Sequence, residues 1–242
     1  MPRMLPPPPF SVEPFSSRPR GSKLYNVPLA TEPPREMIAV LDYDAGNLTS
    51  VACAVRHLGH EPEITRDPEV VRSADRVSFP GVGAAGSSMA TLEKLGLADA
   101  LRDVHSAGRP ILGICIGCQV AFSRSEEDGG TDCLGLLQGE AVRFSFAEGV
   151  DRKVPHMGWN EVRFGGPHAV LEGIPAGSQF YFVHSYHVVP AEPALVLGTA
   201  SYGDIDFTAA VARDNLEAVQ FHAEKSGPAG LKLLENFLEW SP

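Results

Sequence analysis

Residues 113 to 117 read Gly-Ile-Cys-Ile-Gly and place a cysteine, Cys115, between two glycines. Apolar residues typical of a strand precede them, and residues 118 to 122, typical of a helix, follow. A nucleophile on such a sharp strand-to-helix turn needs flanking glycines, because larger side chains would collide with neighbouring backbone. The start of a helix also favours a thiolate. The pattern predicts acyl-transfer chemistry at Cys115.

Other interpretations of Cys115 compete with this one. A buried cysteine at a tight turn is common. Cys115 and Cys118 also have the C-x-x-C spacing of a redox motif. The two glycines favour acyl transfer, because a redox motif does not need them. A zinc site is disfavoured, because no second C-x-x-C or closely spaced histidine pair supplies further ligands, and we expect no metal.

A general base for this chemistry is predicted at His222. It follows the extended run 216–219, and residues two apart on an extended chain face the same side. Glu224 can therefore accept a hydrogen bond from one imidazole nitrogen of His222, while the other imidazole nitrogen faces Cys115. A surface pair in a polar loop is the simpler interpretation. The coincidence with the cysteine turn favours catalysis. No role is assigned to the other histidines, which include His57, His60, His105 and His168.

A glycine-rich segment, Pro80-Gly81-Val82-Gly83, follows the third expected strand. Enzymes with a nucleophile on a strand-to-helix turn use the amide after the nucleophile, here Ile116, and an amide from the loop after the third strand to bind a developing oxyanion. We therefore expect an oxyanion hole formed by Gly81, Val82 and Ile116. A simple turn is the alternative.

Alternating strands and helices must position these residues. The first half of the chain predicts strands at 37–42, 63–65, 76–79 and 110–113, with helices at 48–58 and 87–107. This alternation predicts an α/β fold: a doubly wound, mixed but mostly parallel sheet flanked by helices. In the second half, short turns between strand-like segments predict antiparallel pairing. Those segments are 139–146, 160–164, 179–188 and 194–200, and a closing helix is expected at 228–240.

Composition narrows the class of protein. The 242 residues are 43% hydrophobic and 21% charged, which is typical of one sizeable globular domain. A formal net charge of −10 disfavours a broad surface for nucleic acid or anionic lipid. No apolar run is long enough for a membrane helix, and four cysteines are too few for a disulfide scaffold. We expect a soluble, cytoplasmic protein.

The N-terminal region differs from the rest of the chain. Ten of the 21 prolines lie in the first 34 residues, so residues 1–36 are predicted to be a disordered, proline-rich extension, and residues 37–242 a single domain. A transit peptide is disfavoured by Glu13, Glu32 and the proline run. A translation start at Met37 is an alternative.

Six motifs between Met37 and Trp240 together resemble the glutaminase subunits of imidazole glycerol phosphate synthase, a family of triad (class I) glutamine amidotransferases. The motifs occupy residues 43–48, 80–83, 113–119, 156–160, 182–186 and 220–227. The segments 44–48 and 156–160 and the valine at 82 are similar to this subunit in particular. Three departures are Ala223 for a usual proline, Cys118 for a usual methionine, and the extension before Met37. Ala223 leaves the backbone between His222 and Glu224 less restrained.

The resemblance implies a function and site roles. On this resemblance, glutamine would be hydrolysed to glutamate and ammonia, and the ammonia would pass to a (β/α)8-barrel cyclase partner in a heterodimer of histidine biosynthesis, with no cofactor. The roles it implies are catalytic for Cys115, His222 and Glu224, glutamine-binding for Gln119, Ser185 and Tyr186, and partner-facing for Asn47, Trp159, Tyr181 and Lys225. Rival interpretations are another glutaminase, such as the pyridoxal phosphate synthase partner, and a catalytically inactive binding module.

Overall fold

The computed structural model describes residues 36–242, which cluster as one unit. The predicted N-terminal extension, Glu36 aside, lies outside the described residues. Within residues 36–242, no helix is both long and apolar enough to cross a membrane.

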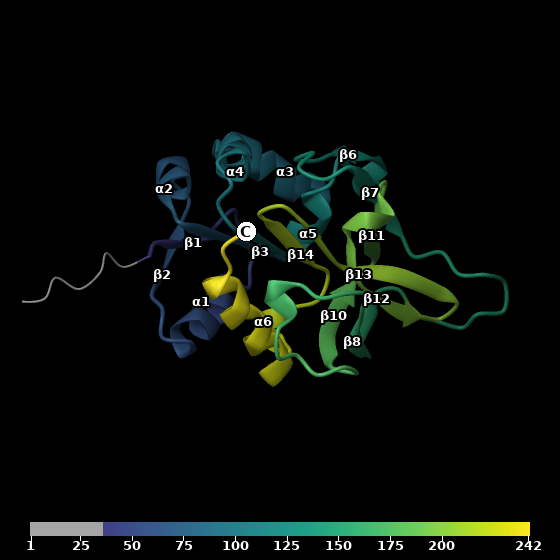
Figure 1. Ribbon diagram of the computed structural model, residues 1–242. Coiled ribbons are helices and arrows are strands. Elements are labelled where there is room, and N and C mark those ends of the chain that lie inside the picture. Colours follow the sequence, from purple (N-terminus) through teal and green to yellow (C-terminus); the bar gives the residue numbers. More distant parts are fainter. Residues whose placement is uncertain (1–35) are drawn as a thin grey trace, which may run out of the picture. The chain divides into compact units, whose positions relative to one another are not determined.

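Five adjacent parallel strands form one half of the main sheet (Figure 1). Their order is β2 (Pro62–Thr65), β1 (Ile38–Leu41), β3 (Arg76–Gly81), β4 (Ile111–Cys115) and β14 (Leu216–Val219). All residues of β1, β3, β4 and β14 are buried, as expected for parallel strands covered on both faces.

Helices cover both faces of this parallel half. One face carries α1 (Leu48–His57) and α6 (Gly227–Glu239), and the other carries α2 (Pro68–Ser73), α3 (Ala85–Lys94), α4 (Leu97–Ser106) and α5 (Ile116–Val120) (Figure 1). Alternate residues of β1 enter different cores, because successive strand side chains point to opposite faces. Ala39 and Leu41 pack in one cluster, and Ile38 and Val40 in the other. The predicted doubly wound, mixed sheet is confirmed.

The rest of the sheet is mainly antiparallel. Beyond β14 lie β13 (Ile205–Arg213), β11 (Tyr186–Pro190), β7 (Gly139–Arg143), β5 (Arg124–Ser125) and β6 (Thr131–Asp132), and β12 (Val196–Tyr202) pairs with β13 and β9 (Arg163–Phe164). A separate antiparallel pair consists of β8 (His156–Glu161) and β10 (Gln179–His184). Short 3-10 turns are η1 (Glu127–Gly129), η2 (Ala169–Leu171), η3 (Pro193–Leu195) and η4 (Ala223–Lys225).

Two predicted elements are divided in the structure. The helix expected at 87–107 is two helices, α3 and α4, because Gly96 between them has a left-handed backbone with φ of 70°. The strand expected at 179–188 breaks at Ser185. Strand β10 pairs with β8 in the separate sheet, whereas β11 pairs with β7 and β13 in the main sheet, so the chain changes sheets at this residue.

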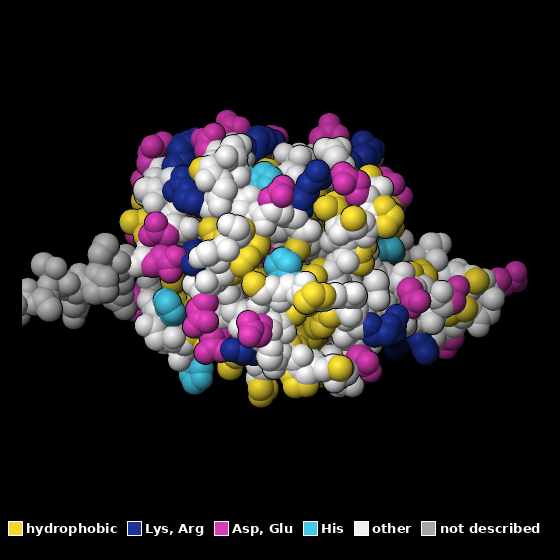
Figure 2. All heavy atoms as spheres, viewed as in Figure 1, with side chains coloured by type: hydrophobic (Ala, Val, Ile, Leu, Met, Phe, Trp, Pro, Cys, Tyr) yellow, Lys and Arg dark blue, Asp and Glu magenta, His cyan; other side chains and the backbone are white. Residues whose placement is uncertain are grey.

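Charged side chains are interspersed on the surface. Figure 2 shows Lys and Arg side chains in small groups with Asp and Glu close by, and no broad basic field on the face in view. Ion pairs such as Arg72 with Asp103 (2.7 Å) account for part of this mixing.

Candidate active site

Cys115 ends β4 and immediately precedes α5, with φ of 56° and ψ of −106°, a backbone conformation that non-glycine residues rarely adopt. The two glycines permit this turn. A Cβ atom on Gly117 would lie 1.9 Å from the Phe79 carbonyl oxygen, and one on Gly113 would lie 3.1 Å from the Gly117 backbone. A side chain at position 117 would therefore collide with the β3 backbone, as predicted, whereas one at position 113 would require its neighbours to shift slightly.

The histidine and the glutamate predicted from the sequence meet at the same end of the sheet. Nδ1 of His222 lies 2.7 Å from Oε1 of Glu224, and neither side chain is exposed. The His222 amide donates to the Tyr181 carbonyl oxygen (2.9 Å), which fixes the backbone although residue 223 is alanine. The imidazole is thus held by its δ nitrogen, and its ε nitrogen has no hydrogen-bond partner among residues 36–242.

The pKa of His222 depends on Cys115. Burial alone would lower the pKa of His222, but its interactions with Cys115 and Glu224 prevail and raise that pKa to about 9. Two other groups lie 3.9 Å from the Cys115 Sγ: Nε2 of Gln220 and the carbonyl oxygen of Val183.

Asn47 belongs to this cluster as well. Its Nδ2 donates to Oε1 of Glu224 and lies 3.4 Å from Nδ1 of His222. Asn47 has φ of 66°, and asparagine is one of the few residues other than glycine that adopts this conformation readily. The sequence predicted Asn47 only at the partner interface, and its side chain points into the catalytic cluster.

The predicted oxyanion segment lies beside Cys115, with Gly81 its register partner on β3. A Cβ on Gly81 would lie 2.1 Å from the buried Tyr43 hydroxyl, so only glycine fits. The Val82 amide donates to the Ala45 carbonyl oxygen. That amide is engaged within the protein and does not point into the site.

A cavity of about 310 Å³ opens next to the sulfur, at the small end of the range for ligand sites. It brings together six residues predicted from the sequence: Val82, Cys115, Ile116, Gln119, Ser185 and Tyr186. Gln119 is held by two hydrogen bonds from its Nε2, to the Tyr186 carbonyl oxygen (3.0 Å) and to Oε1 of Gln220 (3.1 Å).

Sequence reasoning missed the remaining residues that line this cavity: Gly83 as a lining residue, Glu127, Pro155, Val183 and His184. Glu127 lies in the short turn η1, where no periodic pattern marks a site. Its Oε2 accepts the Ala85 amide (2.7 Å), and burial raises its pKa. His184 is buried on β10, and the order His-Ser-Tyr after an alternating strand was the available signal.

The other three residues predicted to face a partner, Trp159, Tyr181 and Lys225, are at least partly exposed. Trp159 on β8 and Tyr181 on β10 are register partners with ring centroids 6.1 Å apart. Trp159 is 54% exposed and its neighbour Met157 63% exposed. Lys225 is exposed on η4, directly after Glu224.

A redox or metal site finds no support in the described residues. Cys118 is buried in the core cluster opposite to that of Cys115, and burial raises the pKa of its thiol. Between residues 36 and 242, no group of three or more His, Cys, Asp and Glu side chains is placed to hold a metal ion.

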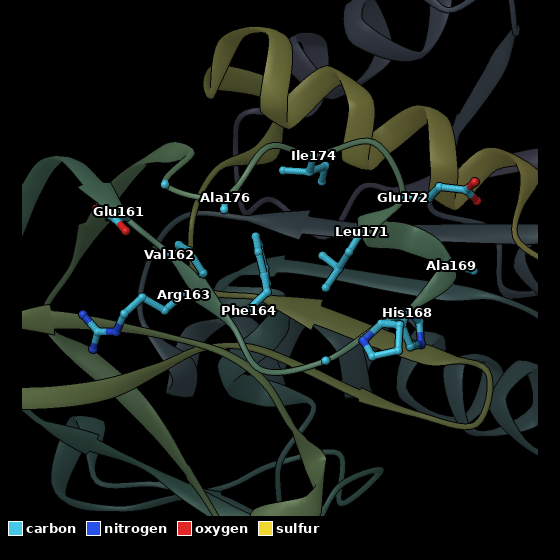
Figure 3. A pocket seen from close by; sticks show the side chains of 13 residues that line it. Glu161, Val162, Arg163, Phe164, His168, Ala169, Leu171, Glu172, Ile174 and Ala176 are labelled. Carbon is cyan, nitrogen blue, oxygen red and sulfur yellow. The ribbon is translucent and has the colours of Figure 1, made fainter.

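A larger cavity of about 770 Å³ lies elsewhere, under the loop between β9 and β10. Figure 3 shows Val162, Phe164, Leu171 and Ile174 directed into it, with Arg163 and Glu172 toward its edges. It contains none of the site residues predicted from the sequence. The smaller cavity beside Cys115 is therefore the candidate active site.

Comparison with known proteins agrees with this geometry. Residues 39–240 match the family model "Glutamine amidotransferase class-I". A solved structure described as a glutamine amidotransferase superimposes with a TM-score of 0.65 at 20% identity, covering 84% of this chain and 97% of that chain. PurLQS from Thermotoga maritima superimposes with a TM-score of 0.65 at 16% identity, covering 85% and 98%. The chain belongs to the class-I glutamine amidotransferases.

Curated relatives narrow this assignment. The imidazole glycerol phosphate synthase subunit HisH of Methylococcus capsulatus is 50% identical over 212 residues, covering 85% of this chain and 97% of its own length. The HisH subunit of Moorella thermoacetica is 50% identical over 202 residues, covering 84% and 94%. Within the class, the chain belongs to the HisH family. The resemblance stated from the motifs is confirmed.

Proposed function

We propose that the chain hydrolyses glutamine through a triad of Cys115, His222 and Glu224. As a class-I amidotransferase of the HisH family, it is the glutaminase subunit of imidazole glycerol phosphate synthase, an enzyme of histidine biosynthesis. The observation that carries the assignment of the triad is the position of His222, which follows β14, the parallel neighbour of the strand β4 that ends at Cys115. Nδ1 of His222 bonds to Glu224, and interaction with the Cys115 sulfur raises the pKa of His222.

The proposed reaction is acyl transfer. The Cys115 thiolate attacks the side-chain amide carbon of glutamine, and the C–N bond breaks as His222 donates a proton to the departing ammonia. Water, deprotonated by His222, then attacks the glutamyl thioester, releases glutamate and restores the thiolate. Glu224 holds the imidazole in the orientation that both steps require. Gln119, Ser185 and Tyr186 line the cavity that would hold the substrate.

The oxyanion formed in each step needs hydrogen-bond donors. We assign this role to the segment Gly81–Val82 and to the Ile116 amide. Because the Val82 amide is bonded to Ala45, the segment must turn before Val82 can donate. A partner that favours the turned conformation would activate hydrolysis by shifting this equilibrium.

HisH relatives are named as subunits of a synthase, which implies a second subunit. We assign that subunit as a (β/α)8-barrel cyclase and the complex as a cytoplasmic heterodimer. Its docking face on this chain would contain Trp159, Tyr181 and Lys225, which lie near the triad at the surface. Ammonia released into water is largely protonated and no longer nucleophilic, so a closed contact between the two active sites suits the chemistry.

The direct test measures ammonia release from glutamine by this chain assembled with a candidate barrel cyclase, together with glutamine-dependent formation of the synthase product. Cys115→Ala is expected to abolish both, and Cys118→Ala, a change at the buried cysteine outside the cavity, to retain both. Glutamine hydrolysis by Cys115→Ala would overturn the assignment. Hydrolysis without product formation would redirect the choice of partner.

A further inference from the structure

Two buried histidines outside the triad are linked in one chain of hydrogen bonds. Nδ1 of His156 lies 2.9 Å from Nε2 of His184, and Nδ1 of His184 lies 2.7 Å from the Tyr186 carbonyl oxygen. At the other end, Nδ2 of Asn160 lies 3.4 Å from Nε2 of His156 and also donates to the Ser201 carbonyl oxygen (2.9 Å). We call Asn160, His156 and His184 the histidine chain.

The donor and the acceptor of each hydrogen bond in the histidine chain follow from the groups at its two ends. A carbonyl oxygen only accepts, so His184 must carry a proton on Nδ1. In a neutral imidazole the other nitrogen, Nε2, then accepts, and His156 must donate to it from its own Nδ1. Nε2 of His156 is left as an acceptor for the Asn160 amide. With both rings neutral, each therefore carries its proton on Nδ1.

The surroundings of the two rings agree with neutral imidazoles. His156 and His184 are 3% and 5% exposed. The rings of Phe144, Phe182, Tyr202 and Phe207 lie around them, with centroids 4.1 to 6.4 Å away. Burial lowers the pKa of His156 to about 4 and that of His184 to about 3.

The histidine chain ends at the cavity beside Cys115. The Tyr186 carbonyl oxygen that accepts from His184 also accepts from Nε2 of Gln119, which in turn donates to Gln220, and Nε2 of Gln220 lies beside the Cys115 sulfur. His184 itself lines the cavity. The histidine chain therefore supports the groups that would position the substrate.

The histidine chain begins on β8, the strand that also carries the exposed Met157 and Trp159. Alternation along β8 directs His156 and Asn160 inward and Met157 and Trp159 outward. One short strand thus carries the proposed docking face on one side and the start of the histidine chain on the other.

We propose that His156 and His184 are positioning residues for glutamine. Their hydrogen bonds, each donated in the direction from β8 towards Tyr186, hold the Tyr186 carbonyl and the Gln119 side chain in the geometry that binds the substrate. This inference rests on the proposed glutaminase function and deepens it. Neither histidine exchanges a proton with glutamine in this role. The triad performs the chemistry, and the histidine chain sets where glutamine lies.

The tautomers are tested without any activity measurement. Imidazole nitrogen resonances of the ¹⁵N-labelled full chain would be recorded from pH 6 to 8, with His156 and His184 assigned by single substitution. Both rings are expected to be neutral with the proton on Nδ1 throughout. A charged ring at pH 7, or a proton on Nε2 of either ring, would overturn the proposal.

A matched pair of variants separates hydrogen bonding from packing. His156→Asn keeps a donor near the Nδ1 position and loses the ring, whereas His156→Phe keeps a ring against Phe182 and Tyr202 and loses the donor. In the assembled synthase, we expect His156→Phe to raise the KM for glutamine about fivefold with kcat changed less than about twofold, and His156→Asn to stay near the unmodified value.

The reverse order, with His156→Asn impaired and His156→Phe unaffected, would assign the ring to packing and overturn the proposal, as would two unaffected variants. Thermal melting of both variants shows whether each is folded at the assay temperature. Cys115→Ala in the same assay separates the positioning role from the glutaminase function. If Cys115→Ala abolishes turnover while both histidine variants behave like the unmodified enzyme, the glutaminase function stands and only the positioning role is removed.

Discussion

Oε1 of Glu224 lies 2.7 Å from Nδ1 of His222 and also accepts from Nδ2 of Asn47, so one buried carboxylate oxygen joins the imidazole to the start of α1. This contact makes the orientation of the base depend on a segment more than 170 residues away in the sequence. It also places a negative charge where it stabilises the imidazolium that forms during acyl transfer.

Glu224→Gln is therefore expected to lower glutamine turnover by roughly 100-fold, at the lower end of what general acid–base catalysis supplies. The amide fills the same space but removes the charge that raises the pKa of His222, so the alkaline limb of the pH–rate profile should move to lower pH. Steady-state rates between pH 6 and 10 test this. Turnover within about twofold of the unmodified enzyme would show that Glu224 does not act on His222.

Asn47 can be probed with two substitutions that tolerate its left-handed backbone. Asn47→Gly removes the donor to Glu224 and should lower turnover about three- to tenfold, the loss of one hydrogen bond. Asn47→Asp keeps the shape but brings a second carboxylate against Glu224, so a larger loss is expected. Assays of both variants decide whether the contact matters, and equal activity of Asn47→Asp and the unmodified protein would contradict its role.

Much of the site could be predicted from the sequence because its determinants are local. The glycines around Cys115 and the two-residue spacing of His222 and Glu224 are short patterns with a direct steric or geometric reason. The parallel strands were likewise indicated by buried apolar runs. These signals do not depend on knowing which distant segment lies nearby.

The features that sequence reasoning missed depend on distant contacts or on one backbone angle. His156 and His184 meet only because β8 and β10 pair outside the main sheet, and Asn47 reaches Glu224 across the parallel half. The break at Gly96 reflects one left-handed residue within a periodic helical pattern. A glycine there permits a break but does not require one.

Stability should fall on acidification in a window set by His156 and His184. In the unfolded chain both rings take up protons near pH 6.5, whereas in the native protein their pKa values lie near 4 and 3, so the unfolded state binds more protons below pH 6.5. His222, with its raised pKa, contributes in the opposite sense and only above pH 6.5. The urea midpoint of unfolding is expected to fall as the pH is lowered from 6.5 to 5, and to fall less in His156→Phe than in the unmodified protein. An equal fall in both proteins would contradict the lowered pKa of His156.

The bond from the Val82 amide to Ala45 predicts that the isolated chain hydrolyses glutamine slowly, because an oxyanion donor is engaged elsewhere. Assembly with the barrel subunit should raise kcat by about 100-fold or more, the effect expected of one oxyanion donor. Turnover of the chain alone and of the complex measures this. Equal rates would remove the proposed reorientation of the Gly81–Val82 peptide and leave the triad assignment untouched.

The most direct test of the central claim is covalent labelling of the assembled synthase with a glutamine-analogue electrophile, followed by peptide mass spectrometry. Cys115 should carry the label, excess glutamine should protect it, and Cys118 should remain unmodified. Label on another cysteine, or no label on Cys115 in a folded complex that turns over glutamine, would contradict a nucleophilic role for Cys115.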